Sequence, residues 1–184
     1  MKLRVCGGKY KRLQINIPES LDGFRPTKNM VREAICNVLT DKIYDADVLE
    51  LCAGSCIFSL EMISRGAKRA LAVEKDSKLC AFLKERINKL FREEQIEILC
   101  EDAAVFTDRT SEKFDIIFFD PPYYTNELAE VAVKLPNICK KYAIIVFEFA
   151  SDDNFVKDII AKNYSDYKIR KYGKSSLAFI YKGG

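Results

Sequence analysis

The sequence predicts a single α/β domain over residues 1–184, with a mainly parallel sheet and helices on both of its faces. One observation is the alternation, from Asp47 onward, of β-prone runs with segments of helical periodicity. A second is the run 114–119, which is apolar on both alternating faces, as expected for a strand buried in a parallel sheet. The third is a pair of strand-like runs around Gly173, which predicts an antiparallel hairpin at one sheet edge.

The expected elements follow in chain order. Residues 1–26 are expected to form a basic arm or hairpin, with a turn at Gly7-Gly8. A helix capped by Thr27 is expected over about 28–41, because apolar residues recur there at helical spacing. The strands are expected near 47–52, 69–74, 96–100, 114–119 and 142–149, and the hairpin strands at 167–172 and 177–181. The other helices are expected near 57–65, 77–91, 126–139 and 153–162.

Composition excludes several kinds of site. The sequence contains no histidine, which excludes Ser-His-Asp catalysis, Cys-His catalysis and histidine-based metal sites. Its seven cysteines form no C-x-x-C pair and are expected to be reduced core thiols, so no metal is expected. No apolar stretch is long enough to span a bilayer, and no signal-peptide core follows Met1. We therefore expect a cytoplasmic protein with no membrane partner, and a monomer.

Positive charge is concentrated at the amino terminus. The net charge is only +3, yet residues 1–18 carry five basic side chains and no acidic one. The five are Lys2, Arg4, Lys9, Lys11 and Arg12. Two interpretations stay open: a solvated, fraying arm, and an arm that binds phosphates.

Polar residues gather where four predicted strands end. They are Glu50, Cys52, Ala53, Gly54 and Ser55 after the first, Glu74 after the second, Asp102 and Ala103 after the third, and Asp120 after the fourth. Ligands of open α/β sheets bind beyond the carboxyl ends of the strands. Gly54 allows a tight turn beside a ligand, Glu74 follows at the spacing of an acid that bonds ribose hydroxyls, and Asp102 could accept from an adenine amine. Taken singly, each residue could instead be a cap or a turn.

The glycine loop favours a nucleoside without phosphates over a dinucleotide. The run Ala53-Gly54-Ser55-Cys56-Ile57-Phe58 lacks the second and third glycines that admit a pyrophosphate. S-adenosylmethionine is a nucleoside of this kind, and its sulfonium makes a methyl group reactive without a metal or a histidine. It is therefore the expected cofactor.

The run Asp120-Pro121-Pro122-Tyr123 follows the predicted buried strand 114–119. Two consecutive prolines hold the chain extended and offer carbonyl acceptors without competing N–H donors. A carboxylate, an adjacent carbonyl and the face of a tyrosine together suit a planar amino group. The alternative interpretation is a rigid strand-to-helix turn capped by the aspartate.

Several motifs together resemble those of the bacterial small-subunit ribosomal RNA guanine-N2 methyltransferases of the RsmD type. They are residues 4–13 of the arm, Arg25-Pro26-Thr27 with 31–35, the loop 51–55, Ser64-Arg65-Gly66-Ala67, the acid-Pro-Pro-aromatic run, and Tyr172-Gly173. The resemblance extends over nearly the whole chain. This sequence departs from the family at Glu50, where Asp is usual, at Cys56, where Gly is usual, and at Ser59, near which a second Gly is usual.

The resemblance implies a Rossmann-like class I methyltransferase that uses S-adenosylmethionine, with a sheet of seven strands, one of them antiparallel. It also implies methylation of the exocyclic 2-amino group of a guanine in 16S ribosomal RNA, within an assembling small subunit. The expected catalytic residues are Asp120, Pro121, Pro122 and Tyr123. The expected cofactor-binding residues are Glu50, Cys52, Ala53, Gly54, Ser55, Glu74, Lys75, Asp102, Ala103 and Asp120. The expected RNA-binding residues are Arg4, Lys9, Lys11, Arg12, Arg25, Lys28 and Arg32.

Methylation of an exocyclic amine needs few protein groups. Asp120 and the Pro121 carbonyl would accept the two amine hydrogens and stabilise the charge that develops on nitrogen, and Tyr123 would stack on the flipped base. No general base is required during transfer, because the product ammonium loses its proton readily. Two alternatives stay open: an enzyme of the same fold that acts on adenine or on a protein glutamine, and a catalytically silent RNA-binding protein.

Overall fold

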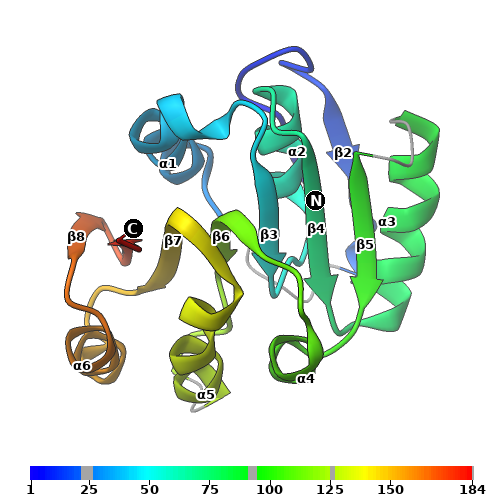
Figure 1. Cartoon of the computed structure of the whole chain (residues 1–184). Coiled ribbons are helices and arrows are strands. Elements are labelled where there is room, and N and C mark those ends of the chain that lie inside the picture. The colour runs from blue at the N-terminus through cyan, green and yellow to red at the C-terminus, as the bar shows by residue number, and fades with distance from the viewer. Residues whose placement is uncertain (22–26, 91–94, 125–126, 184) are drawn as a thin grey trace.

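The computed structural model describes residues 1–21, 27–90, 95–124 and 127–183 (Figure 1). Its strands are β1 (Lys2–Arg4), β2 (Gln14–Asn16), β3 (Asp47–Leu51), β4 (Arg69–Glu74), β5 (Ile96–Cys100), β6 (Phe114–Phe119), β7 (Cys139–Ala150), β8 (Tyr167–Tyr172) and β9 (Ser175–Tyr181). Its α-helices are α1 (Asn29–Ile43), α2 (Ile57–Ser64), α3 (Ser77–Leu90), α4 (Ala103–Arg109), α5 (Glu127–Lys134) and α6 (Asn154–Asn163). Two short 3-10 helices are η1 (Glu19–Leu21) and η2 (Leu135–Ile138). Among these helices, none combines the length and the apolar composition that crossing a membrane requires.

Seven strands form one sheet in the order β5-β4-β3-β6-β7-β9-β8. β3 pairs in parallel with both β4 and β6, so the winding of the chain reverses between β3 and β6. β9 is antiparallel to both of its neighbours, β7 and β8. The predicted sheet, with one antiparallel strand and a C-terminal hairpin at its edge, is therefore confirmed.

Helices cover both faces of the sheet (Figure 1). α1, α2 and α3 pack on one face, over a core that includes Val48 and Phe118. α4, α5 and α6 pack on the other face, over a core that includes Leu49 and Ile117. Successive residues of β6 thus face opposite cores, which explains why this strand is apolar on both sides.

The basic arm folds as an antiparallel hairpin of β1 with β2. The middle residue of each strand, Leu3 and Ile15, is buried in the core on the side of α1, α2 and α3. Lys9, Lys11 and Arg12 lie in the connection between the two strands, and their side chains are exposed. The arm therefore combines an apolar attachment to the domain with an exposed basic loop.

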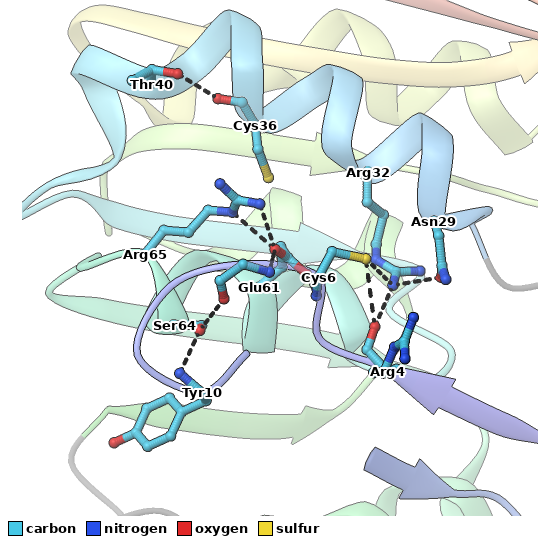
Figure 2. Close-up of polar contacts among 11 residues, drawn as sticks. Arg4, Cys6, Tyr10, Asn29, Arg32, Cys36, Thr40, Glu61, Ser64 and Arg65 are labelled. Carbon is cyan, nitrogen blue, oxygen red and sulfur yellow. Dashed lines mark hydrogen bonds and ion pairs between the residues drawn. The ribbon is translucent and has the colours of Figure 1, made fainter. Parts of the chain in front are cut away.

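The last turn of α2 holds this loop in place (Figure 2). The Glu61 carboxylate accepts hydrogen bonds from the backbone N–H groups of Cys6 and Gly7, at 2.8 and 2.9 Å. The Ser64 hydroxyl oxygen accepts from the backbone N–H of Tyr10 at 2.8 Å and donates to the Gly7 carbonyl at 2.5 Å. The backbone of the arm is thus fixed to the domain, and the interpretation as a fraying tail is wrong for it.

Thr27 does not cap α1, contrary to the sequence prediction. The N-cap is Lys28, whose side chain makes no capping hydrogen bond, and the helix begins at Asn29. The Thr27 hydroxyl donates instead to Oδ2 of Asp120, at 3.0 Å. A hydroxyl that can cap locally can equally bond a distant group, and here the partner is 93 residues away along the chain.

Two helices differ from the prediction. α4 was not expected from the sequence: it has only seven residues, too few to show a clear helical period, and its N-cap Asp102 accepts from the Ala104 N–H at 2.8 Å. The helix expected over 126–139 ends at Lys134 and is followed by η2. Pro136 explains this ending, since it lacks the N–H that would continue the α-helix.

Candidate active site

A cavity of about 950 Å³ opens where β3, β4, β5, β6 and β7 approach or reach their carboxyl ends. This is the crevice at the reversal of the winding, where open α/β sheets bind ligands. Its lining includes all the residues predicted to bind the cofactor and all those of the predicted catalytic motif: Glu50, Cys52, Ala53, Gly54, Ser55, Glu74, Lys75, Asp102, Ala103, Asp120, Pro121, Pro122 and Tyr123. The structure therefore brings these two predicted sets together in one place.

The loop from β3 to α2 forms one wall of the cavity. Gly54 has a φ of 50°, and Cys52 and Cys56 each have a φ of 56°, a left-handed conformation that favours glycine. A side chain in this conformation costs about 1 kcal/mol or more, so the two cysteines strain the loop. Burial raises the pKa of the Cys52 thiol to about 12, which keeps it neutral and unsuited to nucleophilic catalysis at neutral pH.

Glu50 lies at the end of β3 and is buried, with 3% of its surface exposed. Its Oε2 accepts two hydrogen bonds from Ser59 of α2, from the N–H at 2.8 Å and from the hydroxyl at 2.5 Å. Burial raises the pKa of Glu50 to about 7, a larger effect than the lowering caused by the hydrogen bonds from Ser59. The carboxyl group therefore fixes the start of α2 beside the cavity.

Glu74 and Asp102 form part of another wall of the cavity. Glu74 Oε2 accepts from the N–H of Gly54 at 2.7 Å, and its Oε1 accepts from the N–H of Asp76 at 2.9 Å. This links the end of β4 to the glycine loop across the pair β3–β4. Asp102 caps α4 through Oδ1, which accepts from the N–H of Ala104 at 2.8 Å. Both acids thus have the structural bonds of a turn or cap, while both also line the cavity.

Asp120 follows β6 directly and is held from the side of α1. Its Oδ2 accepts from the hydroxyl of Thr27, which is 7% exposed. The Thr27 carbonyl in turn accepts from the guanidinium of Arg32 at 2.7 Å. This chain of bonds orients the carboxylate of Asp120 by way of a buried arginine.

Tyr123 is fixed by the C-terminal hairpin. Its hydroxyl lies 2.9 Å from the Ser175 hydroxyl oxygen, at the start of β9, and 3.4 Å from Oε1 of Glu148 on β7. These contacts hold the phenol oxygen, and the residue lines the cavity. The C-terminal hairpin therefore contributes to the site as well as to the sheet edge.

The lining suits the predicted cofactor better than it suits a phosphate ligand. Among the described lining residues, eight are acidic (Glu50, Glu74, Asp76, Glu101, Asp102, Asp120, Glu130 and Glu148) and three are basic (Lys28, Lys75 and Lys78). A sulfonium carries a positive charge and a nucleoside offers hydroxyl and amino donors, which this excess of acceptors matches. The volume also lies in the usual range for small-molecule sites, about 300–1,000 Å³. In the described ranges, no cluster of acids and cysteines could hold a metal ion.

Six of the seven predicted RNA-binding residues fall into three groups. Lys28 lines the cavity with its side chain exposed. Arg4, Lys9, Lys11 and Arg12 are exposed on the arm and do not line the cavity. Arg25 lies outside the described residues.

Arg32 does not fit its predicted role in RNA binding. Its side chain is fully buried and donates to the carbonyl of Thr27 at 2.7 Å. It also donates to the carbonyl of Arg4 at 2.7 Å and to Asn29 Oδ1 at 2.9 Å (Figure 2). A guanidinium enclosed in this way cannot reach a phosphate, so the prediction is wrong for this residue. Arg32 joins β1 and the start of α1 instead.

Among the lining residues that were not predicted as site residues, two lie beside the Asp120-Pro121-Pro122-Tyr123 motif. The sequence predicts Thr27 as a helix cap, and only its hydrogen bond to the distant Asp120 reveals the other role. Glu148 is a buried acid between Phe147 and Phe149, and it lines the cavity. A charged residue inside an apolar strand, near its carboxyl end, was the available signal for Glu148.

Known proteins resemble this chain over most of its length. The family profile described as Conserved hypothetical protein 95 matches residues 3–181. The ribosomal RNA small subunit methyltransferase D of Haemophilus influenzae is 31% identical over 157 residues, which are 82% of this chain and 80% of that protein.

Solved structures show the same fold. The Escherichia coli protein yhhF superposes with a TM-score of 0.84 at 22% identity, over 100% of this chain and 99% of that one. A 16S rRNA N2 methyltransferase of Thermus thermophilus, solved in complex with AdoMet and guanosine, gives a TM-score of 0.72 at 16% identity, over 88% of this chain and 44% of that one. The match of the family profile to nearly the whole chain, together with the identity to the Haemophilus protein, shows that this chain belongs to the Conserved hypothetical protein 95 family, with the ribosomal RNA small subunit methyltransferases D among its relatives.

Proposed function

We propose that this protein transfers a methyl group from S-adenosylmethionine to the exocyclic 2-amino group of a guanine in 16S ribosomal RNA. The observation that carries the proposal is the position of Asp120-Pro121-Pro122-Tyr123 at the end of β6, in the same acid-rich cavity as Gly54 and Glu74. The relatives named ribosomal RNA small subunit methyltransferase D support the choice of substrate.

The cofactor half of the cavity lies along β3, β4 and β5. Gly54 and its neighbours Ala53 and Ser55 would enclose the methionine part, Glu74 would accept from the ribose hydroxyls, and Asp102 would accept from the adenine amine. When bound, S-adenosylmethionine supplies an electrophilic methyl group, which needs no metal and no histidine. The excess of carboxylates around this half favours a positively charged ligand.

The substrate half is built on Asp120. The amine of guanine is a weak nucleophile, because its lone pair is delocalised into the ring. Asp120 and the Pro121 carbonyl accept its two hydrogens, which stabilises the pyramidal nitrogen and the positive charge that develops on it. Thr27 holds the carboxylate in orientation, and Tyr123, fixed through Ser175, offers its ring for stacking on the base.

The basic arm supplies contacts outside the cavity. Lys9, Lys11 and Arg12 are exposed on a loop whose backbone is fixed by α2, so a phosphate bound there meets a preformed surface. Lys28 follows the arm in the sequence and lines the cavity. We propose a small ribosomal subunit in assembly as the partner that presents the guanine.

The proposal is tested on small-subunit particles from a strain that lacks this gene. Incubation with the protein and S-adenosylmethionine should methylate one guanine, mapped by mass spectrometry of nuclease fragments. In single-turnover measurements Asp120→Asn should keep partial activity, while Asp120→Ala should lower the rate by about 10²–10³-fold. Asp158→Ala, at an exposed position of α6, is the control. Wild-type rates in Asp120→Ala, or a methyl group found on adenine or on protein glutamine, would contradict the proposal.

A further inference from the structure

Glu148 places a second carboxylate next to Asp120. β6 and β7 pair in parallel with Phe119 opposite Phe147. Asp120 directly follows Phe119, and Glu148 directly follows Phe147. Both residues line the cavity. Glu148 is 4% exposed, and the residues on either side of it in β7 are buried and apolar. The sequence thus retains a buried acid where an apolar residue would stabilise the strand more simply.

The side chain of Glu148 faces the substrate half of the cavity. Val146 packs in the core on the side of α1, and Phe147 in the core on the opposite face. The alternation of the strand therefore turns Glu148 toward α1, the side from which Thr27 bonds Asp120. The hydroxyl of Tyr123 lies 3.4 Å from Oε1 of Glu148.

Guanine presents three adjacent hydrogen-bond donors on one edge, the ring N1–H and the two hydrogens of the 2-amino group. The proposed mechanism uses Asp120 and the Pro121 carbonyl for the amine. Glu148, beside Asp120 in the sheet, supplies the remaining acceptor for N1–H. The acceptors of the cavity then match the donors of the base one for one.

The two rival substrates do not match this set. Adenine carries an unprotonated N1 next to its amino group. The lone pair of N1 would face the carboxylate of Glu148, and the two would repel each other. A protein glutamine offers two amide hydrogens and no third donor, so it would form one hydrogen bond fewer with the acceptors of the cavity. The second carboxylate therefore discriminates against both.

We infer that Glu148 accepts the N1–H of the target guanine and is the residue that selects guanine over adenine. This inference rests on the proposed function and narrows it to a recognition mechanism. Tyr123, bonded at its hydroxyl to Ser175, positions the stacked base against this acceptor.

The test changes the acceptor and the base together. RNA is prepared with guanine or with 2,6-diaminopurine at the mapped target position; the latter keeps the 2-amino group but has an unprotonated N1. Glu148→Gln keeps the shape of the side chain and adds an N–H donor, and Glu97→Gln, at an exposed position of β5, is the control for lost charge. The ratio of kcat/KM for the two bases is measured for each protein, and calorimetry with S-adenosylmethionine reports on folding.

We expect the wild-type protein and Glu97→Gln to prefer guanine by about 10–100-fold, the scale of one good base contact. Glu148→Gln should lose most of this preference or reverse it, with cofactor affinity unchanged. Glu148→Asp keeps the acceptor and should keep the preference even at a lower rate, which provides a second measurement if the glutamine variant does not fold. An unchanged preference for guanine in Glu148→Gln, or a lost preference in Glu148→Asp, overturns the inference but not the proposed function. A wild-type protein that methylates adenine overturns the proposed function as well.

Discussion

The buried Glu50 makes the stability of this protein depend on pH. Burial raises its pKa from 4.5 to about 7 in the folded state, while the unfolded chain ionises near the ordinary value. Because the folded pKa is the higher one, the contribution of Glu50 to stability is fully present below pH 4.5 and is lost as pH rises through 7. At 1.36 kcal/mol per pKa unit, the stability that Glu50 contributes is on the order of 3 kcal/mol in total. Roughly 2 kcal/mol of it is lost between about pH 5 and about pH 7.5.

Glu50→Gln should remove this pH dependence of stability, because glutamine stays neutral and its oxygen can still accept from Ser59. Urea unfolding of both proteins across this pH range measures the difference in the free energy of unfolding. We expect the variant to gain roughly 2 kcal/mol relative to the wild type as pH rises. Glu97→Gln, which changes an exposed acid, should track the wild type. A constant difference between Glu50→Gln and the wild type would refute the reasoning.

Three further predictions concern the site and the arm. Thr27→Val removes the hydrogen bond to Asp120 and should lower the single-turnover rate by about 10–100-fold, whereas the rate of Thr27→Ser should stay near that of the wild type. Cofactor affinity should not change in either variant. Equal rates in the two variants would contradict the positioning role of Thr27. Glu74→Ala should weaken S-adenosylmethionine by about 1.5–3 kcal/mol in calorimetry with RNA affinity unchanged, and normal cofactor binding would mean that the ribose site is misplaced. Neutralising Lys9, Lys11 and Arg12 together should reduce the slope of log RNA affinity against log salt by roughly one per lost phosphate contact, and an unchanged slope would exclude them from the RNA interface.

The sheet could be predicted because its signals are local and repeated. Predicted parallel strands such as 114–119 are apolar runs of a strand's length that are followed by a segment of helical periodicity. α4 could not be found in this way, since seven residues cover barely two turns. The end of α5 was readable in principle, because Pro136 stands inside the predicted helix and stops it.

The site was predictable where residues follow strand ends, and not where it depends on contacts across the fold. The carboxyl ends of parallel strands meet at one edge, so Glu74 and Asp120 had to lie near the glycine loop. The prediction for Arg32 is wrong because a basic residue after a basic arm has the same pattern whether it faces solvent or is buried. Only the folded chain shows that Nη1 and Nη2 of Arg32 donate to Thr27 and to the arm.

Both ends of α2 serve a site. Its first turn bonds Glu50 through Ser59, beside the cavity, and its last turn bonds the arm loop through Glu61 and Ser64. Its eight residues span about 12 Å, so this short helix acts as a spacer of fixed length between the cofactor pocket and the basic loop. One inserted residue would turn the arm anchors by about 100° relative to Glu50. In the proposed enzyme, α2 therefore sets the distance between the bound RNA backbone and the base that is methylated.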